Sequence, residues 1–109
     1  HPIIKAMKMH NGIDLPARIG TPIVSTSYGK VTRAEFSSSY GWVVEITSDD
    51  YTARYAHCKT TLVDEGDHVQ IGDTIAEVGS SGLSTAPHCH YEIMKEGINV
   101  DPLSFIYKR

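Results

Sequence analysis

Short runs of alternating apolar and polar residues, separated by turns, are the feature that most restricts the fold of this chain. The runs WVVEIT (42–47) and YTARYAHC (51–58) flank a Ser-Asp-Asp turn and are typical of a β-hairpin. No window of helical periodicity is longer than about two turns, and we expect the segment TTLVDEG to form one short turn at most. The pattern therefore favours strands over helices.

Similar runs continue along the rest of the sequence. We expect strands within residues 21–36, with a bend at Gly29, within 67–79, which carries glycine at its turns, and within 88–97. Residues 99–102 are expected to turn into a short tail. The sequence predicts an all-β fold: a compact single domain, residues 1–109, of antiparallel sheets in a sandwich or barrel-like hybrid with little helix.

Composition excludes several classes of partner. The 109 residues carry a formal net charge of −3, which gives no indication of nucleic-acid binding, because that requires a basic face. No apolar run approaches the roughly 20 residues of a membrane-spanning helix, and the first residues, HPIIKAMK, show no signal peptide. The two cysteines permit one disulfide and do not require it.

Histidines and one carboxylate form the main candidate site. Because strand side chains alternate between faces, His88 and His90 are expected on one face and Cys89 on the other. The same rule predicts that His57 shares a face with Tyr55 and lies opposite Cys58. The stretch HNGID adds one more imidazole and one carboxylate around a glycine that lets the backbone bend.

These residue types suit a metal ion. Neutral imidazole nitrogens and carboxylate oxygens are ligands of Zn²⁺, and a catalytic zinc keeps three protein ligands and one open position. Imidazoles left over near such a metal accept a proton from water or stabilise an oxyanion. The residues alone therefore indicate a hydrolytic metal site.

Other features of the sequence have simpler interpretations. Hydroxyls near His88 permit a nucleophile–base pair, but a polar turn that bonds its own backbone is favoured. The segment 40–42 (YGW) fits a substrate groove or an aromatic edge packed on the core. A lipoyl-type carrier needs a lysine at a hairpin tip, where this chain has none. His68 is expected to be a solvated residue of a hairpin. The hydroxyl residues in question are Ser80, Ser81, Ser84 and Thr85.

Three ordered motifs resemble those of the LytM/lysostaphin-type zinc metallopeptidases, which cleave peptidoglycan cross-links. They are HNGID (10–14), YAH (55–57) and GSSGLSTAPHCHYE (79–92), joined by a family-like hairpin at 63–79. The resemblance implies one Zn²⁺ per domain, held by His10, Asp14 and His90. It also implies that His57 and His88 are the catalytic histidines, and it leaves open which of them is the general base.

The resemblance further implies the activity and the compartment. We expect a zinc-dependent endopeptidase acting on peptide stems or bridges of peptidoglycan, in the periplasm or outside the cell, within a longer protein with regulatory segments beyond this chain. The alternative is a catalytically weak peptidoglycan-binding or hydrolase-activating domain of the same fold. All five site positions are present, which favours the enzyme. The choice between D-alanine cross-links and glycine bridges stays open.

Departures from the family pattern leave smaller questions. Cys58 and Cys89 stand where leucine is common, and either a disulfide or two buried free thiols fits them. Tyr55 is a weak candidate for the substrate groove, because alternation directs it to the His57 face. Glu92 shares the face of His90 and either orients that histidine or is a surface carboxylate.

Overall fold

The computed structural model describes residues 7–8, 13–81 and 87–100, and within these ranges every regular element is a β-strand. All pairings are antiparallel, which confirms the expected all-β fold. The strands are β1 (Met7–Lys8), β2 (Ile13–Pro16), β3 (Pro22–Val24), β4 (Gly29–Ser37), β5 (Gly41–Ser48), β6 (Tyr51–Thr61), β7 (His68–Val69), β8 (Thr74–Val78), β9 (His88–Lys95) and β10 (Ile98–Val100).

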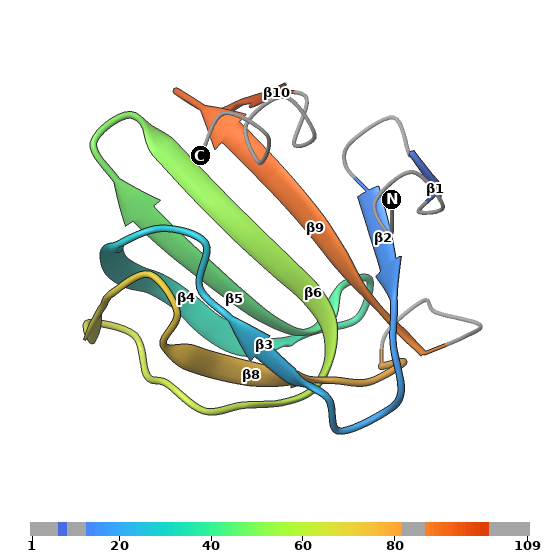
Figure 1. The fold of residues 1–109 in the computed structure, drawn as a ribbon. Coiled ribbons are helices and arrows are strands. Elements are labelled where there is room, and N and C mark those ends of the chain that lie inside the picture. The colour runs from blue at the N-terminus through green and yellow to red at the C-terminus, as the bar shows by residue number, and fades with distance from the viewer. Residues whose placement is uncertain (1–6, 9–12, 82–86, 101–109) are drawn as a thin grey trace.

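The main layer of the fold is a sheet in the order β1-β2-β9-β6-β5-β4-β7 (Figure 1). The β5–β6 hairpin turns at Asp49–Asp50, as its sequence predicts. Strand β9, although distant in sequence, pairs with the other side of β6 and carries β2 on its outer side. The central strands β6 and β9 therefore bring the YAH and HCHYE regions together with Ile13 and Asp14, the described part of the HNGID motif.

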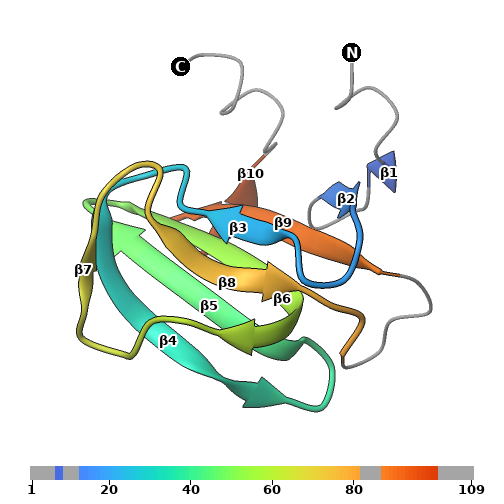
Figure 2. The same ribbon diagram turned by 60° about the horizontal axis from the view of Figure 1, so that its bottom comes forward.

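A second layer covers one face of that sheet. The end of β6, from Cys58 to Thr61, leaves β9 and pairs with β8, which in turn pairs with β3. Figure 2 shows β3 and β8 lying across the sheet formed by β4, β5, β6 and β9. The core lies between these layers and is built from inward-facing residues that include Val31, Val44, Ile46, Tyr55, Cys58, Ile75, Val78, Cys89, Tyr91 and Ile93.

The structure adds detail to one expected segment and corrects another. The run 21–36 is divided into β3 and β4, which belong to different layers, because the chain leaves β8 after Val24 and joins β5 from Lys30. The residues expected to form a turn at 99–100 instead belong to β10, which pairs with β9. The actual turn is at Glu96 and Gly97, both with positive φ, a backbone typical of tight hairpins. The other two residues of the expected turn, 101–102, lie outside the described ranges.

The described ranges contain no helix long and apolar enough to cross a membrane.

Candidate active site

Asp14 and His90 face each other across the β2–β9 ladder. They are directly opposite in register, and Nδ1 of His90 lies 2.8 Å from Oδ1 of Asp14. His88, two residues earlier on β9, places Nε2 3.4 Å from the same carboxylate oxygen. The alternation predicted for His88 and His90 therefore holds, and it directs both rings toward Asp14.

His57 reaches the same site through an irregularity in β6. Tyr55 is opposite Tyr91 and Ala56 is opposite His90, so regular alternation would put His57 on the Tyr91 face. Instead His57 has a φ of 61°, a left-handed conformation that is uncommon for any residue with a side chain. Its ring centre lies 5.1 Å from that of His88 and 6.1 Å from that of His90. The kink thus adds a third imidazole to the pair on β9.

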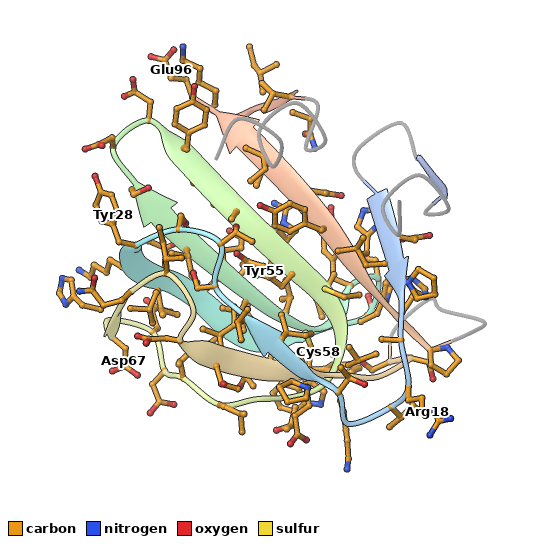
Figure 3. All side chains as sticks on the ribbon, viewed as in Figure 1. Arg18, Tyr28, Tyr55, Cys58, Asp67 and Glu96 are labelled. Atoms are coloured by element: carbon orange, nitrogen blue, oxygen red, sulfur yellow. The ribbon has the colours of Figure 1, made fainter. Side chains whose placement is uncertain are left out.

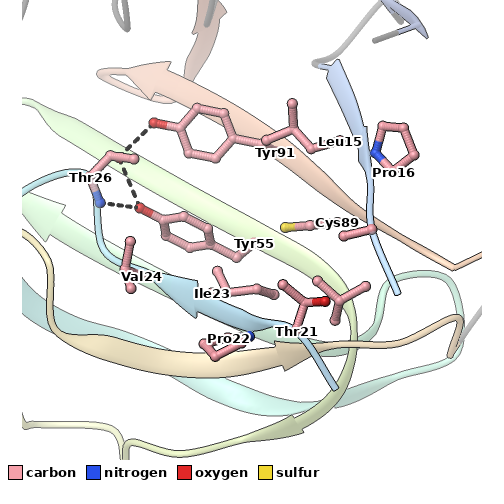
Figure 4. A pocket seen from close by; sticks show the side chains of 12 residues that line it. Leu15, Pro16, Thr21, Pro22, Ile23, Val24, Thr26, Tyr55, Cys89 and Tyr91 are labelled. Carbon is pink, nitrogen blue, oxygen red and sulfur yellow. Dashed lines mark hydrogen bonds between the residues drawn. The ribbon is translucent and has the colours of Figure 1, made fainter. Parts of the chain in front are cut away.

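The same irregularity separates Tyr55 from the histidines. Tyr55 is buried in the core layer, where its hydroxyl contacts the backbone nitrogen and the hydroxyl of Thr26, both at 3.0 Å (Figures 3 and 4). Thr26 also bonds the hydroxyl of Tyr91 at 2.7 Å. The expectation that Tyr55 shares the His57 face is wrong, because it assumed an unbroken strand, and this placement removes Tyr55 from a groove at the histidines.

Backbone contacts fix the ring and tautomer of His57. Its Nδ1 lies 2.6 Å from the carbonyl oxygen of Ser81. Since a carbonyl only accepts hydrogen bonds, Nδ1 carries the hydrogen and Nε2 keeps a lone pair. Burial lowers the pKa of His57, and the neighbouring His88 adds to that effect, against the opposing influence of the Ser81 carbonyl. A neutral His57 is therefore suited to accept a proton.

Ser81 is itself held in place by strands β5 and β6. Its hydroxyl donates to the carbonyl of Cys58 at 2.5 Å and accepts from the backbone N–H of Trp42 at 3.0 Å. Gly41, with a φ of 67°, allows this approach, because a Cβ atom there would stand 2.5 Å from the carbonyl carbon of Ser81. The Ser81 hydroxyl is thus engaged with backbone groups, as the polar-turn interpretation expects. Residues 84 and 85 lie outside the described ranges.

Glu92 lies under His90 rather than on the surface. Its side chain is 2% exposed, and Oε2 accepts a hydrogen bond from Nε2 of His90 at 2.7 Å. Its other oxygen, Oε1, accepts from Arg54 at 2.5 Å. Burial would raise the pKa of Glu92, but the bonds and charges of His90 and Arg54 outweigh it, so the pKa of this carboxyl is lowered.

The contacts of His90 also change its own protonation. The hydrogen bond to Glu92 raises the pKa of His90, burial opposes it, and Asp14 adds to the increase. The raised pKa of His90 and the lowered pKa of Glu92 both favour the charged forms of this pair in the metal-free protein.

Sequence reasoning missed Arg54 and the two residues that hold it. Arg54 donates through Nε to Glu45 at 2.8 Å and through Nη1 to the hydroxyl of Tyr40 at 2.8 Å. Arg54 is opposite Glu92 on one neighbouring strand and opposite Glu45 on the other. The sequence shows only a charged residue between the alanine and the tyrosine of the strand YTARYAHC, and this residue acquires meaning only once the register of three strands is known.

Two of the three expected zinc ligands lie among the described residues, and their atom types suit zinc. Asp14 and His90 offer one carboxylate oxygen and one imidazole nitrogen, the atom types that zinc binds in catalytic sites. His10, the third expected ligand, lies outside the described ranges. Within those ranges, no group of three His, Cys, Asp or Glu side chains is arranged to hold a metal ion.

The opposite face of β9 lines an apolar cavity. It has a volume of about 290 Å³ and lies between β2, β3 and the core, with Leu15, Ile23, Cys89 and Tyr91 among its lining (Figure 4). Cys58 and Cys89 are buried free thiols, the second of the two interpretations left open for them. Burial raises the pKa of Cys58 to about 12 and that of Cys89 in the same direction, so both stay protonated at neutral pH.

Comparison with known proteins places these features in a family. Residues 8–102 match Peptidase family M23. The peptidoglycan DD-endopeptidase ShyC of Vibrio cholerae serotype O1 is 37% identical over 103 residues, which make up 94% of this chain and 24% of ShyC. The chain thus spans about a quarter of the length of curated relatives such as ShyC.

Solved structures share the fold. The catalytic domain of the antimicrobial peptidase lysostaphin from Staphylococcus simulans superposes with a TM-score of 0.86 at 34% identity, covering 91% of this chain and 80% of that one. A zinc-containing peptidase from Vibrio cholerae superposes with a TM-score of 0.81 at 32% identity, covering 92% of this chain and 33% of that one.

Proposed function

This chain belongs to peptidase family M23, and on that premise we propose that it is a zinc-dependent endopeptidase that hydrolyses peptide cross-links of bacterial peptidoglycan. The observation that carries the proposal is the convergence of Asp14, His88 and His90 with His57, whose Nε2 keeps a lone pair. The similarity to ShyC, a peptidoglycan DD-endopeptidase, and to lysostaphin, an antimicrobial peptidase, supports this substrate class.

Asp14, His90 and His10 would hold one Zn²⁺ in the domain formed by residues 1–109. When bound, this ion supplies Lewis-acid catalysis, which polarises the scissile carbonyl and acidifies water. His57 would accept the proton of the attacking water through Nε2, because its Nδ1–H is engaged with the Ser81 carbonyl. His88 lies beside His57 and would serve as the second imidazole at the reacting carbonyl.

The compartment follows from the substrate. Peptidoglycan lies outside the cytoplasmic membrane, so we propose that the protein works in the periplasm or at the cell exterior, with peptide stems or bridges as its partners. Buried free thiols that stay protonated are compatible with that setting, because they do not depend on an external reductant.

Digestion of purified sacculi tests the proposal. We expect the protein to release muropeptides whose masses correspond to opened cross-links, with activity abolished by a chelator and restored by added Zn²⁺. The masses also distinguish cleavage at D-alanine cross-links from cleavage within glycine bridges. His57→Ala should abolish release, whereas His68→Ala, on the exposed β7 hairpin, should not.

One outcome separates the two candidate functions. A protein that binds sacculi and zinc but releases no fragment would contradict the enzyme and support the alternative, a binding or hydrolase-activating domain.

A further inference from the structure

Building on the proposed function, we propose that Arg54 and Glu92 act as a positioning pair that orients the ring of His90 for metal binding. Neither residue touches the scissile bond; both act through His90. Glu45 and Tyr40 hold the guanidinium of Arg54 and complete this unit, which we term the Arg54 clamp.

The two carboxylate oxygens of Glu92 bind different partners. Its Oε2 bonds Nε2 of His90 at 2.7 Å, and its Oε1 bonds Arg54 at 2.5 Å. A carboxylate only accepts hydrogen bonds, so Nε2 of His90 carries a hydrogen. The other ring nitrogen, Nδ1, faces the Asp14 carboxylate at 2.8 Å and by the same rule carries a hydrogen in the metal-free protein. With Nε2 held by Glu92, Nδ1 is the ring nitrogen that would release its proton and bind the metal. A flipped ring would present carbon to the buried carboxylate and lose this bond.

Arg54 is held rigidly in place. Its guanidinium donates to Glu45, Tyr40 and Glu92, and its Cζ lies 4.7 Å from the centre of the Tyr40 ring. A planar guanidinium with several fixed donors has little freedom once these bonds form. The register of β5, β6 and β9 places the pairs opposite one another, so the alignment of the clamp comes from the sheet itself.

The charged side chains of Glu92 and Arg54 are both largely buried. Glu92 is 2% exposed and Arg54 is 17% exposed at their side chains. Apolar residues of similar size would stabilise a sheet at least as well as a buried ion pair. Stability therefore offers no reason for a carboxylate at residue 92, whereas a hydrogen-bonded histidine ligand does. Partners of this kind fix the orientation of a ligating histidine and raise its basicity.

Arg33 supplies a matched control. It lies on the same face and bonds Glu45 at 3.1 Å and Glu35 at 2.7 Å, whereas Glu92 is bonded by Arg54. Arg33→Met removes the same charge and a contact to the same glutamate as Arg54→Met. It leaves the bond between Glu92 and His90 in place.

The test compares zinc affinity, catalysis and folding in the same proteins. The variants are Glu92→Gln, Arg54→Met, Arg54→Lys and the control Arg33→Met. Zinc dissociation constants come from competition with a chelating dye, kcat and KM from cross-link cleavage, and folding from thermal unfolding of the metal-free protein. We expect Glu92→Gln and Arg54→Met to weaken zinc binding by about 10- to 100-fold and to lower kcat more than they raise KM. Arg33→Met should stay within about twofold.

Two further comparisons keep the inference open to refutation if Arg54→Met unfolds. Arg54→Lys keeps the positive charge but loses the planar guanidinium with its several donors. The double variant Arg54→Met/Glu92→Gln removes both charges, so no buried ion is left unpaired. Each should fold and still bind zinc at least about tenfold more weakly.

The outcomes separate the two proposals. Wild-type protein that binds zinc and cleaves, together with folded Glu92→Gln and Arg54→Lys proteins of unchanged zinc affinity, would overturn the inference alone. Lower melting temperatures with unchanged zinc affinity would likewise assign the clamp a purely structural role. A wild-type protein that binds no zinc would contradict the proposed function itself, and the clamp with it.

Discussion

The two faces of strand β9 differ sharply although they alternate along the same eight residues. One face carries His88, His90 and Glu92, each bonded or close to another charged or polar group. The other carries Cys89, Tyr91 and Ile93, all buried in the core. Glu92 and Tyr91 are equally inaccessible, at 1% of their surface. Burial by itself therefore does not distinguish the core from the site.

The difference between the faces lies in what replaces water. On the core face, burial of apolar surface is itself favourable and tolerates small changes of shape. On the histidine face, each buried polar atom needs a specific partner, because an unpaired one costs the full desolvation penalty. We therefore expect substitutions on the two faces to fail in different ways, one in stability and the other in activity.

The largest effect should follow from removing a ligand on the histidine face. His90→Ala should lower kcat/KM by at least about 10³-fold, because a metal ion supplies several kcal/mol of transition-state stabilisation. The free energy of unfolding of the metal-free protein should fall by about 1–3 kcal/mol, because Oε2 of the buried Glu92 loses its partner. That loss is smaller than the roughly 4 kcal/mol to which a 10³-fold fall in activity corresponds. Muropeptide release and calorimetry of the same sample measure both, with the exposed His68→Ala as control. Retention of a tenth of the activity would contradict the site.

The reverse pattern is expected three residues further along β9. Ile93→Ala should lower the free energy of unfolding by about 2–5 kcal/mol, because it leaves a cavity in the core. The folded fraction should keep the kcat of the wild type. Urea denaturation measures the loss, and Ile98→Ala, at a position 72% exposed, should cost less than about 0.5 kcal/mol. A fall in kcat as large as that of His90→Ala would erase the distinction between the faces.

A substitution at the junction of the two layers should affect both properties. Gly41→Ala should destabilise the protein by about 1–3 kcal/mol, through a strained φ and a clash with Ser81. It should also lower kcat, because the Ser81 carbonyl fixes the tautomer of His57. Gly66→Ala is the matched control: it has a positive φ but nothing within 4 Å of the added Cβ. Equal loss of kcat in both variants would argue against the Ser81 contact.

The smallest effect concerns alkaline pH and the core face. The pKa of Cys58 is raised from 9.0 to about 12 in the folded protein. Between these values the unfolded chain has released a proton that the folded chain keeps, so stability falls as pH rises through this window. Cys58→Ala should reduce that slope by up to about 1.4 kcal/mol per pH unit. Urea titrations at several pH values above 8 measure it, and an unchanged slope would contradict the burial of this thiol.

The sequence predicts those features that depend on local pattern. The separation of His88 and His90 from Cys89 follows from strand alternation alone, and the structure shows it. The hairpin at Asp49 follows from turn residues between two alternating runs. The same reasoning fails at Tyr55, because nothing in the pattern YAH indicates that His57 adopts a left-handed backbone.

Long-range register accounts for the rest of what was missed. Arg54 and Glu92 are 38 residues apart and meet only because β6 and β9 pair at those positions. Glu45 and Tyr40 join them from a third strand and its preceding turn. Alternation predicts the face on which a strand residue lies but not the residue that it pairs with on the neighbouring strand. The Arg54 clamp therefore could not be derived from one sequence.

The left-handed backbone at His57 has a consequence for engineering. Glycine adopts such a conformation at no steric cost, so His57→Gly would relieve the backbone strain while removing the ring that bonds Ser81. Grafting the histidines onto another sheet by counting residues would likewise aim this ring at the wrong layer. Substitutions intended to raise the thermal stability of this domain should therefore leave residue 57 unchanged and be placed in the loops.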